Sequence, residues 1–125
     1  MVDPMTHSAH ILLVDDDRQV IRFLKKALES AGYRVSATTS GKDALQAIAD
    51  GRPDLLILDL NMPEPDGFDV LRVERAKFPY LRTIVISGYL EGALLEAAEI
   101  FGAVATLQKP VSPDALIAKV REVLG

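Results

Sequence analysis

The feature that most constrains the fold of this chain is a strict alternation of short apolar runs with amphipathic stretches. An unbroken apolar run of this length is typical of a strand covered on both faces. Each run is followed by a stretch with apolar residues at helical spacing, which predicts a parallel sheet with helices on both faces. The pattern is therefore (βα)5, a doubly wound α/β fold. The expected strands are Ile11–Val14, Tyr33–Thr38, Leu55–Leu58, Thr83–Ile86 and Ala103–Leu107.

Local signals mark several helix ends. The first helical stripe ends at Gly32, where a C-terminal glycine is expected. Ser40 with Asp43 three residues later is typical of a capping box. Ser112 followed by Pro113 predicts an N-cap and a proline in the first turn of the last helix.

The apolar stripes assign the buried side of each helix. In the first helix the stripe includes Val20, Phe23 and Leu24. In the third helix Phe68, Leu71 and Arg75 lie on one side, and Pro79 ends the helix. The fourth helix is expected over residues 90–101.

Composition limits the function classes. A chain of 125 residues fits one compact domain, assigned to residues 10–125 after a flexible leader at 1–9. The net charge of -4 and the lack of a basic run argue against direct binding of nucleic acid. No apolar stretch reaches the roughly 20 residues that span a bilayer. Cysteine is absent, which excludes disulfides and fits a cytoplasmic protein.

Polar side chains follow four of the five expected strands. Because the carboxyl ends of parallel strands meet at one edge of the sheet, these side chains are expected to share one shallow site. We interpret the third acid after the first strand, Asp17, as a cap for the next helix. The remaining candidates are Asp15 and Asp16 after the first strand, Asp59 after the third, Ser87 after the fourth and Lys109 after the fifth.

Three carboxylates brought together repel one another unless a cation compensates them. Oxygen-only ligands favour Mg²⁺, which keeps several waters and shares phosphate oxygens. A carboxylate is also a competent nucleophile toward phosphoryl groups. Asp59 is the best candidate, because it ends the most apolar strand, and Lys109 and Ser87 could stabilise the developing negative charge.

These residues resemble those of the receiver domains of two-component response regulators, over nearly the whole chain from His10 to Leu124. The resemblance implies a flavodoxin-like sheet of strand order 2-1-3-4-5. It also implies a cytoplasmic signalling module that switches an output partner or domain and turns over no separate substrate. The matching segments are Ile11–Asp16, Leu58–Pro63, Asp66–Gly67, Ser87–Gly88 and Lys109–Pro110.

The resemblance also implies a role for each site residue. Asp59 would accept the phosphoryl group from a phosphohistidine on a sensor histidine kinase or phosphotransfer protein. Asp16 and Asp59 would ligate Mg²⁺ through their side chains and Asn61 through its backbone carbonyl, while Asp15 would act through a metal-bound water. The phosphoryl group would be bonded by Ser87 and paired with Lys109, whose bond to Pro110 would be cis.

The chain departs from the family pattern beside this site. Thr106 stands where most receivers have an aromatic ring that moves on activation, and Gly88 stands where alanine is common. Tyr89 follows Gly88. We therefore expect Tyr89 to cover part of the site or to replace the missing ring.

Three other functions fit parts of the pattern. A haloacid-dehalogenase-type phosphatase would use Asp15 and Asp17, but Gln19 stands where its motif needs threonine or valine. A flavodoxin-like cofactor binder needs a hydroxyl- and glycine-rich phosphate loop after the first strand, where this chain has three acids. A receiver fold could also serve as a binding module without phosphorylation.

Overall fold

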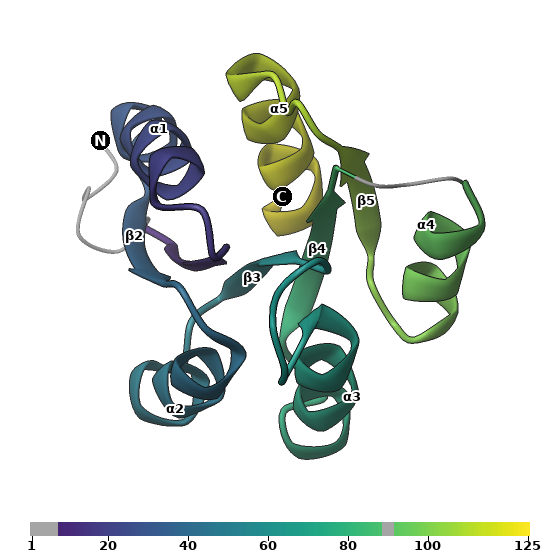
Figure 1. The fold of residues 1–125 in the computed structure, drawn as a ribbon. Coiled ribbons are helices and arrows are strands. Elements are labelled where there is room, and N and C mark those ends of the chain that lie inside the picture. The colour runs from purple at the N-terminus through teal and green to yellow at the C-terminus, as the bar shows by residue number, and fades with distance from the viewer. Residues whose placement is uncertain (1–7, 89–91) are drawn as a thin grey trace.

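The computed structural model describes residues 8–88 and 92–125, which fold into one five-stranded parallel sheet flanked by helices (Figure 1). The strand order β2-β1-β3-β4-β5 confirms the expected doubly wound, flavodoxin-like α/β fold. The strands and helices alternate along the chain as predicted. Their bounds are β1 His10–Val14, α1 Arg18–Ser30, β2 Arg34–Thr38, α2 Gly41–Gly51, β3 Leu55–Asp59, α3 Gly67–Lys77, β4 Arg82–Ser87, α4 Gly92–Ile100, β5 Ala105–Gln108 and α5 Pro113–Leu124.

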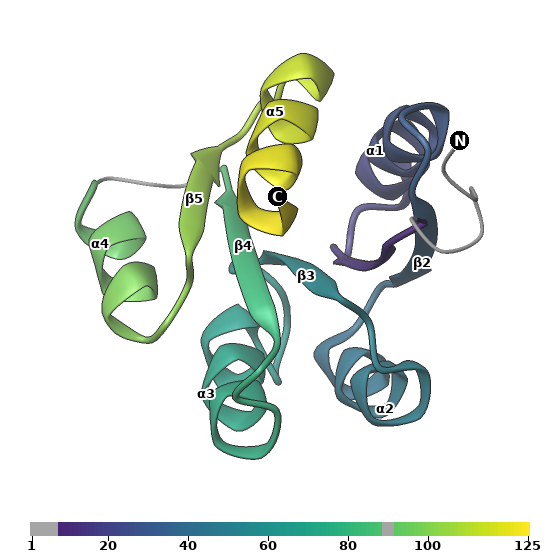
Figure 2. The same cartoon turned by 180° about the vertical axis from the view of Figure 1, so that it is seen from behind.

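The sheet separates two hydrophobic layers. The two opposite views of the ribbon show the helices that lie on either side of the sheet (Figures 1 and 2). Leu12 and Val14 of β1 pack in the layer that holds the buried residues of α2 and α3. Ile11 and Leu13 pack in the layer that holds those of α1 and α5. Alternate residues of a strand point to opposite faces, so this division follows from the pleat.

The same alternation determines to which face of the sheet the residues at the carboxyl ends of β1 and β3 point. Ile11 pairs with Leu55 and Leu13 with Ile57 across the two strands. All four belong to the α1 and α5 layer. Asp59 continues the Leu55 and Ile57 series, and Asp15 follows Ile11 and Leu13 with the same spacing. The register thus brings the two carboxylates to neighbouring strands at one edge.

The N-caps expected at Ser40 and Ser112 are present, but only the Ser40 half of the capping box predicted with Asp43 is formed. Ser40 accepts a hydrogen bond from the Asp43 N–H at the start of α2, and Ser112 caps α5 with Pro113 in the first turn. Gly32 has a φ of 101°, the left-handed conformation that glycine adopts after a helix. A full capping box occurs at the start of α3, where Asp66 and Asp69 bond reciprocally.

The buried faces of two helices differ from the expected apolar stripes. In α3 the buried residues include Glu74 beside Val70 and Leu71, while Arg75 is exposed. The pattern missed Glu74 because a carboxylate reads as a surface residue. Phe23 of α1, assigned to the apolar stripe, is 57% exposed. Its exposure leaves an aromatic ring on the surface near the carboxyl ends of the strands.

Strand and helix limits differ slightly from the expected ones. β2 begins at Arg34 rather than at Tyr33, and β5 covers Ala105–Gln108 rather than 103–107. Residues 1–7 of the expected leader lie outside the described residues, while the Ser8 hydroxyl donates to the Gly32 carbonyl. In the described part of the chain, every helix falls short of the length and apolarity needed to cross a membrane.

Two glycines, which lack a side chain, allow the segment between β3 and α3 to pack closely against its neighbours near the site. A Cβ on Gly67 would lie 2.5 Å from the Asp59 carbonyl oxygen and against the Leu60 backbone. The Gly67 N–H donates to the Leu60 carbonyl at 3.2 Å. Gly41, at the start of α2, leaves room for the Pro65 carbonyl in the same way. The backbone around Asp59 is therefore packed against the start of α3.

We predict that Gly67→Ala destabilises the protein by about 1–3 kcal/mol, the usual cost of overpacking. The added methyl group must displace the Asp59–Leu60 backbone, so cross-peaks around Asp59 should shift in an NMR spectrum. Gly51→Ala is the control, because its Cβ would meet only the His10 ring at an ordinary 3.5 Å. Equal denaturation midpoints for the two variants would contradict the packing described for Gly67.

Candidate functional site

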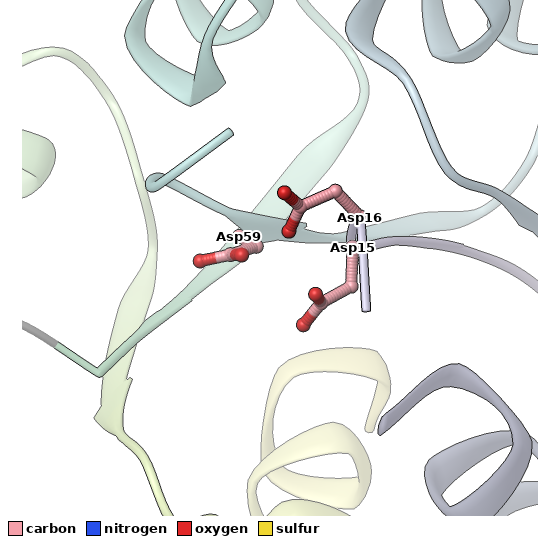
Figure 3. Close-up of side chains that lie close together, drawn as sticks. All are labelled: Asp15, Asp16 and Asp59. Atoms are coloured by element: carbon pink, nitrogen blue, oxygen red, sulfur yellow. The ribbon is translucent and has the colours of Figure 1, made fainter. Parts of the chain in front are cut away.

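Three carboxylates meet at the carboxyl edge of the sheet (Figure 3). Asp15 and Asp16 lie in the segment directly after β1, and Asp59 is the last residue of β3. One oxygen of each lies within 4.8 Å of the others. Asp15 is fully buried and Asp59 is 2% exposed, whereas Asp16 faces solvent. The sequence placed all three correctly at one edge.

Lys109 reaches this cluster from the segment after β5. Its Nζ lies 2.7 Å from Oδ2 of Asp15 and 3.3 Å from Oδ2 of Asp59. Its backbone N–H donates to the Ser87 carbonyl at 2.8 Å, which anchors the start of the segment to β4. The Lys109–Pro110 bond is cis, in agreement with the resemblance. The ammonium therefore bridges two buried carboxylates from two neighbouring strands.

Burial and neighbouring charges shift the proton affinities of these groups. Burial raises the pKa of Asp59 to about 6, and the Asp15 charge adds to the rise. The Asn61 N–H, which donates to Oδ1 of Asp59 at 3.1 Å, and the Lys109 ammonium both oppose it. Although burial of Lys109 favours its neutral form, the bonds to Asp15 and Asp59 hold its pKa above the usual value.

The remaining predicted residues surround the cluster. Ser87 ends β4 and is buried. Gly88 is exposed, and a Cβ built on it would lie 3.6 Å from the Lys109 side chain, an ordinary contact. Thr106 is half-buried in β5, paired with Val85. Tyr89 lies outside the described residues, so its expected covering role stays a prediction.

Asp17 is a helix cap, as expected. Its Oδ1 accepts from the Gln19 N–H at 2.9 Å, at the start of α1. The Asp17 N–H in turn donates to Oδ1 of Asp15 at 2.9 Å. This second bond orients Asp15 while leaving its Oδ2 to Lys109. A phosphatase that needs the Asp17 carboxylate as a free acid is disfavoured by this bonding.

The donor set fits a hard divalent cation. Three ionised carboxylates and one ammonium leave two negative charges uncompensated at the edge. All candidate ligands are oxygen atoms, which Mg²⁺ prefers, and the exposed Asp16 leaves one side open to water. The arrangement brings together a buried carboxylate that could act as a nucleophile, oxygen atoms that could hold a cation, and an ammonium group, which are the parts that phosphoryl transfer requires.

An apolar groove of about 400 Å³ opens beside Lys109. Val20, Phe23 and Leu24 form its α1 side, and the stem of Lys109 lies in its opposite wall. The rest of that wall is Gly88, Pro110 and Val111. The sequence analysis missed this groove, because Phe23 and Val20 fit a core stripe and only the tertiary structure places them next to Pro110.

Comparison with known proteins agrees with this arrangement. Residues 11–121 match the response regulator receiver domain family. The chain belongs to this family, whose members are signalling modules of two-component systems.

Curated relatives include the response regulator MprA of Mycobacterium ulcerans strain Agy99 and that of Mycobacterium tuberculosis strain H37Rv. Each is 38% identical to this chain over 117 residues, which is 94% of the chain. The match covers 50% and 51% of the two relatives, so the chain spans about half their length.

Two solved structures show the same fold. The CheY-like receiver domain protein of Methanospirillum hungatei JF-1 superposes with a TM-score of 0.89 at 29% identity, covering 94% of each chain. The chemotaxis response regulator CheY4 of Vibrio cholerae gives 0.86 at 26% identity, covering 93% of this chain and 98% of its own.

Two variants should move the Asp59 pKa in opposite directions. Lys109→Met removes a positive charge, so we predict that the Asp59 pKa rises above its value of about 6 in metal-free protein. Asp15→Asn removes a negative charge, so the Asp59 pKa should fall. Carboxyl ¹³C shifts followed against pH would measure both.

The sign of the linkage follows from the same values. Folding raises the pKa of the Asp59 carboxyl group from 3.8 to about 6, so the native state binds this proton more tightly than the unfolded state does. The folded protein therefore loses stability as the pH rises through this range. This loss of stability with rising pH should continue to a higher pH in Lys109→Met and should end at a lower pH in Asp15→Asn. Shifts of the same sign in the two variants would contradict the pairing seen at the site.

Proposed function

We propose that this chain is a cytoplasmic phosphoacceptor domain, in which Asp59 receives a phosphoryl group from a phosphohistidine and thereby switches an output partner or domain. The observation that carries the proposal is the charge balance at the sheet edge. Three carboxylates face one ammonium there, which leaves two negative charges that one divalent cation would balance. Membership of the receiver family supports the same reaction.

Asp16 and Asp59 would hold Mg²⁺ through their carboxylates, Asn61 through its backbone carbonyl and Asp15 through a bound water. When bound, the cation compensates negative charge on the acceptor and on the phosphoryl oxygens. Lys109 has a second function in this arrangement. Its ammonium compensates one of the two negative charges of Asp15 and Asp59, and it would pair with a phosphoryl oxygen after transfer.

In the transfer step, a carboxylate oxygen of Asp59 attacks phosphorus and forms the acyl phosphate O–P bond. The P–N bond to the donor imidazole breaks, and that nitrogen keeps the electron pair. The burial of Asp59 suits this step, since a weakly solvated carboxylate is a better nucleophile once ionised. Ser87 would donate its hydroxyl hydrogen to a phosphoryl oxygen.

We predict a single phosphoryl adduct on the wild-type chain after incubation with Mg²⁺ and acetyl phosphate. Intact-mass spectrometry should detect it, and Asp59→Asn should abolish it. Asp50→Asn is the matched control, because Asp50 is an exposed residue of α2 bonded only by Gln46 among the described side chains. Failure of the wild type to form an adduct would favour a phosphorylation-independent binding module.

The same assay separates the acids after β1. Asp16→Asn should need at least about tenfold more Mg²⁺ for the same rate, because a hard cation loses a charged ligand. Asp17→Asn should need no more than the wild type, since asparagine also caps helices. An equal effect of both substitutions would contradict the ligand assignment.

The groove beside Lys109 is the proposed docking place of the phosphodonor. It adjoins the acceptor site, and its exposed Phe23 offers an apolar anchor for a helix that carries the phosphohistidine. A donor seated there would approach the ammonium that pairs with the phosphoryl group.

The test uses a histidine phosphotransfer protein that phosphorylates the wild type. We predict that Phe23→Ala slows transfer from this donor by about tenfold or more, which is the effect of losing an interface anchor. The rate with acetyl phosphate should not change, because that donor needs no docking surface. Tyr80→Ala is the control, since Tyr80 is 59% exposed in the turn before β4. Equal slowing with both donors would show that Phe23 affects the site itself.

A further inference from the structure

Glu74 is a buried acid that the proposed phosphoryl chemistry does not use. It lies on α3 with no exposed surface, and its Oε1 accepts a hydrogen bond from the Thr83 hydroxyl at 2.7 Å. Its Oε2 has no partner among the described residues. An ionised carboxylate with one bond and an orphaned oxygen is costly in such a place, whereas the protonated form is tolerated.

The groups packed around Glu74 offer little compensating charge. Arg75 is the charged neighbour that acts on it, and its side chain lies on the protein surface directly over Gly102. The buried polar side chain that contacts Glu74 is the neutral Thr83, and the rest of the hydrophobic layer beneath α3 brings apolar side chains against it. Val85 of β4, Ala98 of α4 and Ala103 after it belong to that layer. Burial accordingly raises the pKa of Glu74 to about 7.

The hydrogen bond from Thr83 connects three elements. Thr83 is the second residue of β4, and its carbonyl accepts the Val104 N–H at 2.9 Å in the turn between α4 and β5. On the same side, the Phe68 ring of α3 packs edge-on against Phe101, with the ring centroids 5.7 Å apart. The position of α3 on β4 is thus coupled to the turn after α4.

We propose that Glu74 and Thr83 form a proton-dependent latch, which fastens α3 and the α4–β5 turn to β4 when the carboxyl group is protonated and loosens when it ionises. The protonated carboxyl group carries no net charge, so the apolar layer around it has no charge to compensate. Ionisation leaves a buried charge that opening of the α3–β4 contact would hydrate. The latch is separate from the acceptor site, because Ser87 and Asp59 lie at the opposite ends of their strands from Thr83 and Leu55.

Glu74→Gln removes the titration while keeping the shape and the Thr83 bond. The native state holds the proton of Glu74 up to a pH of about 7, while the unfolded state releases it near the ordinary value of 4.5. Stability is therefore lost as the pH rises between these values. The unfolding constant of the wild type, divided by that of Glu74→Gln, should rise by up to about fiftyfold from pH 5 to pH 8.

Denaturant unfolding of the metal-free full chain across this pH range would measure the ratio. Asp59 titrates in both proteins, so its contribution to the unfolding constant cancels in the ratio. Glu99→Gln, an exposed glutamate on α4, is the matched control and should keep the ratio to wild type constant. A ratio for Glu74→Gln that is equally constant would overturn the proposal.

Two local measurements make the test independent of global stability. The carboxyl ¹³C signal of Glu74 in the wild type should titrate near neutral pH, and at a higher pH in Thr83→Val, which lacks the hydroxyl donor. The Val104 amide, in hydrogen exchange corrected for intrinsic rates, should lose more protection between pH 6 and pH 8 in wild type than in Glu74→Gln. A Glu74 signal that titrates near 4.5, or equal loss of Val104 protection, would refute the latch.

Discussion

Three carboxylates and one ammonium group share the carboxyl edge of the sheet, and the rest of the molecule positions them. Lys109 touches both Asp15 and Asp59, which come from neighbouring strands, so it neutralises part of a charge cluster that would otherwise oppose folding. Asp15 follows the buried apolar run Ile11–Val14 of β1, and Asp59 follows the buried apolar run Leu55–Leu58 of β3. The cluster therefore depends on a buried core that holds like charges close together, and Lys109 lowers the cost of that arrangement.

The fold could be predicted from the sequence because parallel strands covered on both faces leave an unambiguous pattern. Nearly continuous apolar runs predicted the central strands β1, β3 and β4, and the mixed segments of β2 and β5 completed the alternation. Ser40, Gly32 and Ser112 marked helix ends through local bonds that depend on few neighbours. The site could be placed for a related reason. In a parallel sheet the residue after each strand is brought to a common edge, so position along the chain already determines proximity.

What the sequence could not predict depends on contacts between distant segments. Phe23 fits an apolar stripe, but the groove beside it forms only when α1 meets the segment after β5. Glu74 reads as a surface residue of α3, and its burial depends on Thr83 supplying a hydroxyl from β4. Both cases concern side chains whose surroundings are set by tertiary packing rather than by helical period. The two unusual positions beside the site, Thr106 and Gly88, could be noticed in the sequence only through the family resemblance.

The close approach of Gly67 to the Asp59 carbonyl, and of Gly41 to that of Pro65, also bears on how such domains can be recombined. A chimaera joined between β3 and α3 would take the Asp59–Leu60 backbone from one parent and the glycine that packs against it, Gly67, from the other. The segment from Gly41 to Lys77 should instead be exchanged as one unit. The contacts of Gly41 with Pro65 and of Gly67 with Asp59 lie within it and position the backbone around the acceptor. Exchange points after Lys77 would leave that block intact, and the second half of the domain, which supplies Ser87 and Lys109, could be replaced separately.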